Sequence, residues 1–117
     1  IGYLLAFEQQ YNAWFDSMDL MLSPVTGSPA VHIGDQAPDG DFDKVMESVL
    51  NFAAFTAPMN VAGSASMSVP LSWSPSGLPI GSMFSGKKGD DALLFELALE
   101  LEAARPWADR LPGVVAS

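Results

Sequence analysis

The sequence predicts an α/β fold in which helices flank part of a β-sheet. Apolar residues recur at helical spacing over residues 4–18, 42–57 and 93–104. Polar and apolar residues alternate over residues 66–73, as they do in a half-buried strand. The tetrapeptide that follows, Ser-Pro-Ser-Gly at 74–77, is typical of a hairpin turn with Pro at its second position. The expected order is therefore helix, strand, helix, β-hairpin, helix.

The first helix is expected to begin at the start of the sequence. Its apolar stripe consists of Leu4, Phe7, Tyr11, Trp14, Phe15 and Met18. No Ser, Thr, Asp or Asn precedes this stripe as an N-cap, which predicts a chain that is one piece of a larger fold. Residues 19–24, DLMLSP, predict a short buried strand that Pro24 ends, and a loop rich in Gly, Pro, Ser and Asp follows over 25–40.

The second half of the chain predicts a longer helix, a hairpin and a final helix. The helix over residues 42–57 keeps one stripe apolar, and Asn60-Val-Ala-Gly63 supplies a turn after it. Residues 78–84 form the strand that pairs with 66–73. Asp90 is the expected cap of the final helix, which stops before Pro106. So few strands cannot cover this much apolar surface, which predicts one edge of a larger sheet.

Composition excludes several classes of function. The 117 residues are 49% apolar and 16% charged, which is typical of a packed chain. The net charge of -9 argues against a nucleic-acid partner or an anionic membrane surface, because both need clustered Lys and Arg. The absence of Cys excludes disulfides and a thiol nucleophile and leaves the compartment open. No apolar run approaches the ~20 residues of a membrane span, so no membrane partner is expected.

The stretch GSMFSGKK at residues 81–88 matches seven of the eight positions of a phosphate-binding loop. The eighth position is Lys88, where Ser or Thr would bind magnesium, and Met83 and Phe84 would place bulky apolar groups inside the phosphate cradle. A strand end followed by a basic turn is the better interpretation. No nucleotide cofactor is expected.

Acidic residues in the long loop have the spacing of a calcium loop at Asp39, Asp41 and Asp43. The sixth position, normally Gly, is Lys44, and the twelfth, normally Glu, is Leu50. These acids are therefore interpreted as a solvated loop that helps to start a helix, since acids favour helix N-termini. No metal site is expected.

His32 and the serines Ser64, Ser66 and Ser68 are the remaining candidates for chemistry. A single His without Cys provides too few ligands for a zinc site and is interpreted as a structural loop residue. The nucleophile elbow G-x-S-x-G is absent, because Ala65 stands where its Ser would be. No complete active site is expected within these 117 residues.

One long segment carries a resemblance to a known family. Residues 55–70, FTAPMNVAGSASMSVP, are joined by Gly77-Leu78-Pro79-Ile80-Gly81, Gly86, Asp91, Leu93-Leu94, Ala98, Glu102 and Pro106-Trp107. In this order and spacing they closely resemble the C-terminal region of the amidase signature hydrolases, and residues 19–26 resemble the family's strand before its variable loop. The resemblance covers essentially the whole chain. It implies that residues 1–117 are the C-terminal portion of a single amidase domain with a mixed β-sheet flanked by helices.

The resemblance also implies a mechanism. Family members use a Ser-Ser-Lys triad, in which Lys acts through a bridging serine and the nucleophilic serine forms an acyl-enzyme. The Gly/Ser-rich signature that carries this triad lies upstream in the family, and Lys44, Lys87 and Lys88 match no catalytic position. We therefore expect no catalytic residue and no cofactor in this chain. Ala65 departs from the family pattern, where Pro is commoner.

The position seven residues before Asn60 bears on the substrate. In the amidase component of glutamyl-tRNA amidotransferase it is typically Asp, and here it is Ala53, which cannot pair with an ammonium group. Leu50, Ala53 and Ala57 would share one face of the helix expected over 42–57. They are the predicted substrate-binding residues, as a small apolar part of the pocket. Plain core packing is the open alternative.

These observations predict the C-terminal part of a serine hydrolase that cleaves an uncharged amide, or a related carbamate or ester. The alternative is a non-catalytic acidic interaction domain or a pseudoenzyme scaffold. The expected partners are a small-molecule amide substrate and the remainder of the amidase polypeptide, with a homodimer left open. The expected compartment is the cytoplasm.

Overall fold

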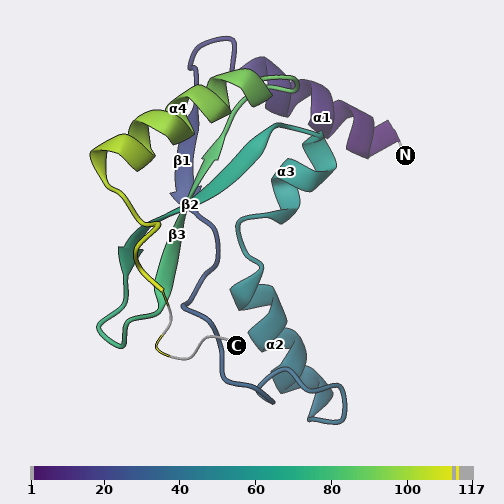
Figure 1. Cartoon of the computed structure of the whole chain (residues 1–117). Coiled ribbons are helices and arrows are strands. Elements are labelled where there is room, and N and C mark those ends of the chain that lie inside the picture. The colour runs from purple at the N-terminus through teal and green to yellow at the C-terminus, as the bar shows by residue number, and fades with distance from the viewer. Residues whose placement is uncertain (1, 112, 114–117) are drawn as a thin grey trace.

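The computed structural model describes residues 2–111 and 113, which form four helices and three strands. Figure 1 shows them in chain order: α1 (Gly2–Trp14), β1 (Met21–Pro24), α2 (Phe42–Phe52), α3 (Ala57–Ala62), β2 (Ser66–Trp73), β3 (Pro79–Ser85) and α4 (Asp91–Ala104). The α/β class is confirmed. Among the described residues, no helix combines the length and the hydropathy that a membrane span requires.

The three strands form one antiparallel sheet in the order β1-β3-β2. Phe84 of β3 lies opposite Leu22 of β1 and Met67 of β2, so β3 is the central strand. A mixed sheet was expected, and both strand pairs among the described residues are antiparallel. The ladder between β2 and β3 shifts register between Val69 and Ser72, which marks an irregularity near Pro70.

The predicted hairpin is confirmed. Gly77 donates its N–H to the carbonyl oxygen of Ser74 at 2.9 Å, which closes the turn. Gly77 has a φ of 85°, a value that favours glycine. The Ser74 hydroxyl also accepts the N–H of Leu78 at 3.0 Å.

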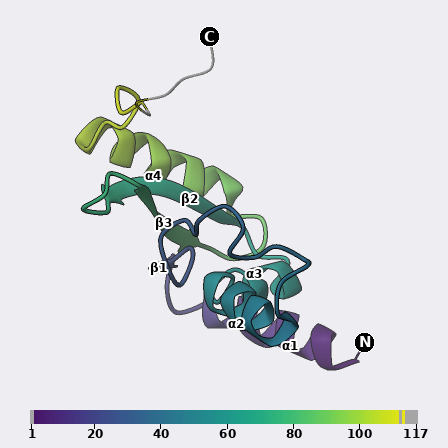
Figure 2. The same cartoon turned by 90° about the horizontal axis from the view of Figure 1, so that it is seen from below.

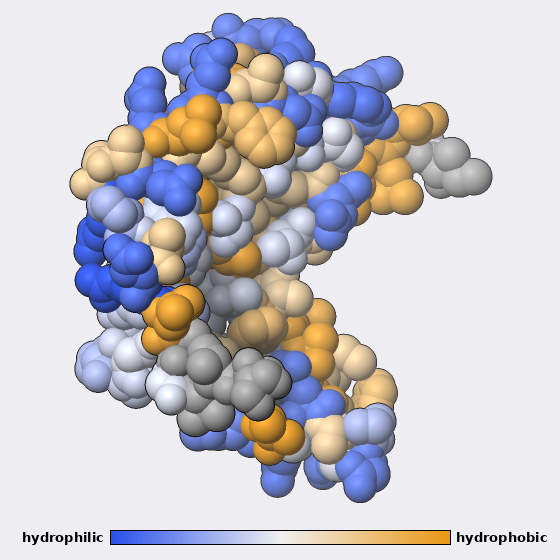
Figure 3. Space-filling view, viewed as in Figure 1, coloured by the Kyte–Doolittle hydropathy of each residue, from blue (hydrophilic) through white to orange (hydrophobic). Residues whose placement is uncertain are grey.

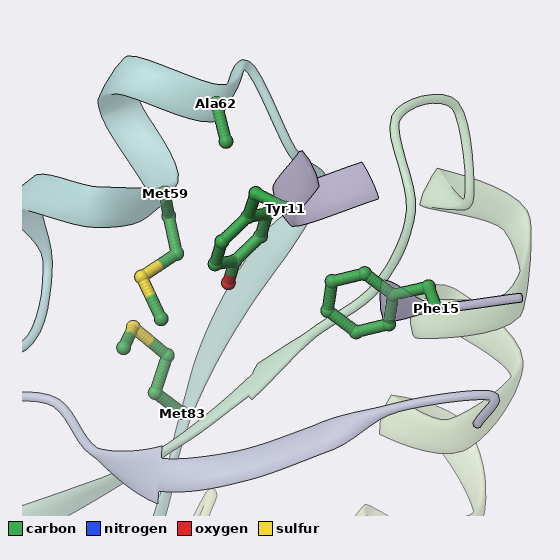
Figure 4. Close-up of a cluster of buried hydrophobic side chains, with 5 residues drawn as sticks. All are labelled: Tyr11, Phe15, Met59, Ala62 and Met83. Atoms are coloured by element: carbon green, nitrogen blue, oxygen red, sulfur yellow. The ribbon is translucent and has the colours of Figure 1, made fainter. Parts of the chain in front are cut away.

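Helices lie on both sides of the sheet (Figure 2). α4 packs along β2 on one side, whereas α1 and α3 pack against each other on the opposite side. A cluster of buried apolar side chains lies on the α1 side and consists of Tyr11, Phe15, Met59, Ala62 and Met83 (Figure 4). Tyr11 lies in the middle of this cluster, between Met59 and Phe15. Val69 of β2 and Leu94 of α4 are buried as well.

Two of the predicted helices differ in extent from those in the structure. α1 ends at Trp14, so Phe15 and Met18 follow the helix, although Phe15 is still buried. The single helix expected over 42–57 is wrong, because α2 ends at Phe52 and a separate helix, α3, begins at Ala57.

Pro58 explains why a new helix begins at Ala57 and why one helix does not run through this region. Its ring nitrogen has no N–H to donate to the carbonyl group four residues earlier, and its ring would clash with that carbonyl group in a continuous helix. Pro is tolerated in the first turn of a helix, and Pro58 occupies that place in α3. The expected turn at Asn60–Gly63 is accordingly the end of α3, which Gly63 closes with a φ of 60°.

Candidate functional site

The predicted substrate-binding residues lie around the break between α2 and α3. Leu50 is on the last turn of α2 with 64% of its surface exposed. Ala53 is the C-cap of α2, and its N–H donates to the carbonyl oxygen of Val49 at 2.9 Å. Ala57 is the first residue of α3. All three side chains are exposed in the described part of the chain.

The predicted substrate-binding residues do not all lie on one helical face. Leu50 and Ala53 are neighbours on one helical turn, as expected from their three-residue spacing. Ala57 does not share their helical face, because it belongs to the next helix. The candidate site is therefore a helix end and a helix start, and its assignment as a substrate pocket stays a prediction.

A backbone hydrogen bond joins the loop after β1 to the end of α2. Gly27 donates its backbone N–H to the carbonyl oxygen of Phe52 at 3.1 Å. A Cβ atom at Gly27 would collide with the carbonyl oxygen of Asn51, so this close approach requires glycine. Thr26 closes the loop by donating its hydroxyl to the carbonyl oxygen of Ser28 at 2.7 Å. Sequence reasoning missed Gly27, whose only local signal is its place in the loop that follows β1.

A small cavity of about 210 Å³ lies beside the same loop. It is lined by residues of the loop and of β3, including Thr26, Ser28, Ile80 and Gly81. Leu50, Ala53 and Ala57 do not line it. The loop therefore contacts the end of α2 through Gly27 and lines the cavity with the polar side chains of Thr26 and Ser28.

The turn in GSMFSGKK has no free cradle for a phosphate group. The N–H of Lys87 donates to the Asp90 carboxylate at 2.8 Å, and the N–H of Lys88 donates to the side-chain oxygen of Asn12 at 2.8 Å. A phosphate-binding loop needs such backbone N–H groups for its ligand. Asp90 stands at the N-cap position of α4, but its side chain serves this turn and does not cap the helix, which corrects the predicted role.

The two lysines of this turn are paired with α1 and the residues just after it. The ammonium group of Lys87 lies 2.5 Å from the Asp16 carboxylate, and that of Lys88 lies 2.6 Å from the Glu8 carboxylate. The hydrogen bond from Lys87 to Asp16 raises the pKa of Lys87 above its ordinary value. The two ion pairs attach the β3–α4 turn to α1 and to the residues just after it.

The serines do not form a nucleophilic site. Ser66 donates to the hydroxyl of the fully buried Ser85 at 2.9 Å. The Ser64 hydroxyl is buried and has no hydrogen-bond partner within the described residues, and the same is true of the Tyr11 hydroxyl. Among these residues none of Ser64, Ser66 and Ser68 has a hydrogen bond to a Lys, His or carboxylate group that could act as its base.

The hydroxyl of Tyr11 is perturbed by its surroundings. Burial raises its pKa above 10.0, because the ionised form loses hydration. The hydroxyls of Ser64 and Ser85 are close enough to offset part of this rise, although neither forms a hydrogen bond with it. Tyr11 is consequently neutral at physiological pH and serves as a core residue.

The long loop contains the N-cap of α2 and His32. Asp41 caps α2 by accepting the N–H of Lys44 at 3.2 Å, which confirms the interpretation of this acid as a helix start. His32 lies on the surface, and its backbone N–H donates to Asp35 at 3.0 Å. Within residues 2–111 and 113, no group of three or more His, Asp or Glu side chains is placed to hold a metal ion.

Comparison with known proteins gives one consistent result. The family model described as "Amidase" matches residues 3–95. The chain is 41% identical over 95 residues to a Mycobacterium leprae protein named "Putative amidase AmiC", a match that covers 81% of this chain and 20% of the relative. It is 31% identical over 108 residues to the 6-aminohexanoate-cyclic-dimer hydrolase of Paenarthrobacter ureafaciens, covering 87% of this chain and 22% of that protein.

Solved structures show the same relation. A 6-aminohexanoate cyclic dimer hydrolase superposes with a TM-score of 0.82 at 30% identity, over 94% of this chain and 24% of that structure. A glutamyl-tRNA(Gln) amidotransferase component from Thermotoga maritima superposes with a TM-score of 0.71 at 26% identity, over 93% of this chain and 23% of that structure. The chain thus spans about a fifth to a quarter of the length of these relatives.

Proposed function

The chain belongs to the amidase family, and we propose that it forms the C-terminal part of a hydrolase that cleaves the C–N bond of an uncharged amide. The observation that carries this proposal is the family match over residues 3–95, supported by relatives named as amidase and as hydrolase. A carbamate or an ester is the related substrate class. The substrate is a small molecule.

The proposed chemistry passes through an acyl-enzyme. A serine oxygen bonds to the carbonyl carbon of the amide, the C–N bond breaks, and the amine leaves with a proton. Water then adds to the ester and releases the carboxylic acid and the serine. Because the described serines of this chain have no base beside them, the reacting groups are assigned to the rest of the polypeptide.

We assign residues 1–117 to one domain together with that remaining polypeptide. The radius of gyration is 16.9 Å, whereas a compact domain of this length has about 13 Å. Large apolar side chains are exposed, including Tyr3 at 81%, Leu22 at 65% and Phe95 at 72%. Figure 3 shows apolar groups on the surface around a hollow in one face of the molecule. A surface of this kind is typical of a buried interface.

The role proposed for the α2–α3 break is to form an apolar wall of the substrate pocket. Its support is the exposure of Leu50, Ala53 and Ala57, together with the Gly27 N–H that holds the neighbouring loop against Phe52. Exposed alanines at a helix end leave room for an apolar group. They offer no charge that would select a substrate ammonium group.

Substitutions of Ala53 in the full-length protein test whether this surface is a wall of the substrate pocket. Ala53→Asp should lower kcat/KM for a neutral amide by about tenfold, because an unpaired carboxylate beside apolar groups is costly to desolvate. An amide that carries an ammonium group should lose less. Ala54→Asp is the matched control, since Ala54 is the adjacent exposed alanine. Ala53→Trp should discriminate against long substrates relative to short ones.

The possible results distinguish a failure of the pocket assignment at Ala53 from a failure of the proposed hydrolase activity. If Ala53→Asp lowers kcat/KM for the neutral and the ammonium-bearing amide by the same factor, Ala53 is a packing residue and the pocket assignment is wrong. If the full-length protein hydrolyses neither amides, carbamates nor esters, the proposed function is wrong and the non-catalytic alternative stands.

A further inference from the structure

The segment that follows α4 runs back beside the β2–β3 hairpin (Figure 1). Between them lies an open groove of about 880 Å³, a volume within the range of small-molecule sites. The walls include two tryptophans, Trp73 from the end of β2 and Trp107 from the segment after α4. Pro70, Pro75 and Pro79 add rigid apolar surface.

Arg110 is the cation of this groove. Its guanidinium carbon lies over the Trp73 ring, 3.9 Å from the ring centre, which is a cation–π contact. Its backbone N–H donates to the carbonyl oxygen of Trp107 at 3.0 Å, so the main chain at Arg110 is fixed in a turn. Among the described residues, the guanidinium group has no salt-bridge partner. A guanidinium group over a ring keeps its N–H donors at its edge, where a planar anion can reach them.

We propose that this groove binds a small carboxylate with a flat apolar body, such as an aryl carboxylate. The apolar body would lie against the tryptophan and proline surfaces, and the carboxylate would accept hydrogen bonds from the edge of Arg110. Asp109 also lines the groove and repels an anion. This repulsion favours a singly charged carboxylate over a doubly charged phosphate ester and places the carboxylate at Arg110.

The site is separate from the features on which the proposed function rests. Trp107, Asp109 and Arg110 all lie beyond residue 95, where the family match ends. The α2–α3 break contributes no residue to the groove. Binding of a carboxylate in this groove does not require amide hydrolysis, so a failure of either can be told from a failure of the other.

The test compares three probes with the same ring on the full-length protein: phenylacetate, 2-phenylethanol and 2-phenylethylamine. Dissociation constants are measured by ligand-observed NMR titration for the wild type and for Arg110→Gln, Arg110→Lys and Asp109→Asn. Arg105→Gln is the matched control, because Arg105 is exposed and does not line the groove. Thermal melting verifies that each variant is folded.

Phenylacetate should bind about tenfold more tightly than 2-phenylethanol, the size expected for hydrogen bonds to a charged group. Arg110→Gln should abolish this preference, and Arg110→Lys should restore only part of it, because Lys lacks the planar edge. Asp109→Asn should tighten phenylacetate binding about two- to fivefold, as expected for removing one exposed like charge. The proposal is overturned if phenylacetate and 2-phenylethanol bind equally, if 2-phenylethylamine binds most tightly, or if Arg105→Gln has the same effect as Arg110→Gln.

Discussion

Asn12 connects three segments that are far apart in the sequence, and its removal should destabilise the protein measurably. Its amide nitrogen donates to the carbonyl oxygen of Ala62 at the end of α3, at 3.2 Å. Its amide oxygen accepts the N–H of Lys88 in the β3–α4 turn, at 2.8 Å. A third bond, to the carbonyl oxygen of Glu8 at 2.9 Å, stays within α1. Asn12→Ala removes all three without changing a charge.

The expected loss follows from the two long-range bonds. Each contributes about 1 kcal/mol net, because folding exchanges a hydrogen bond with water for one within the protein. The bond to Glu8 adds little, since that carbonyl group already lies within the helix. Alanine favours a helix over asparagine by about 0.5 kcal/mol, which offsets part of the loss. Asn12→Ala should therefore lower the free energy of unfolding by about 1.5 kcal/mol.

Urea unfolding of the full-length protein measures this value. The unfolding midpoint should fall while the slope with urea stays constant, because the surface exposed on unfolding does not change. Asn60→Ala is the control, since Asn60 is an exposed asparagine on α3 whose side chain has no hydrogen bond among the described residues. Equal midpoints for the two variants would refute the assignment of Asn12 as a connection between segments.

Three further substitutions test other features of the structure. Tyr11→Phe removes a buried hydroxyl that has no partner among the described residues, so it should leave stability unchanged or raise it by about 1 kcal/mol in urea unfolding. Because the folded state holds the Tyr11 proton above pH 10.0, the variant should also lose less stability than the wild type as pH rises past that value. Lys87→Ala should leave activity close to wild type, and ATP should not raise the melting temperature; a clear rise would restore a nucleotide-binding role. Gly27→Ala should lower both stability and kcat/KM through its collision with Asn51, whereas Gly2→Ala, where a Cβ meets nothing, should not.

The hairpin could be predicted from the sequence because each of its signals is local. Alternation over residues 66–73 and the turn at 74–77 are both visible without knowledge of distant contacts. β2 and the turn lie where these patterns place them, and β3 begins and ends one residue later than expected. α4 likewise begins directly after Asp90 and ends before Pro106.

The connections to α1 could not be predicted in this way. Asn12 is separated by 50 residues from Ala62 and by 76 from Lys88. Nothing in the local sequence of an asparagine on a helix indicates such partners. The same applies to Lys87 and Lys88, whose apparent motif suggests a ligand although their side chains pair with Asp16 and Glu8. Long-range polar contacts depend on how the helices and strands pack, and this packing cannot be predicted from local patterns in one sequence.

The break after Phe52 illustrates how one misplaced boundary changes the interpretation of a site. In a helix continued to residue 57, the carbonyl oxygen of Phe52 would accept the N–H of Thr56, four residues later. Because α2 ends at Phe52, this carbonyl group lacks a partner within the helix and accepts the N–H of Gly27 instead. Pro58 stands in the first turn of α3, where the chain begins a new helix after this break. The surface proposed for substrate is therefore built by a helix end and a loop, and Gly27 belongs to it as much as Ala53 does.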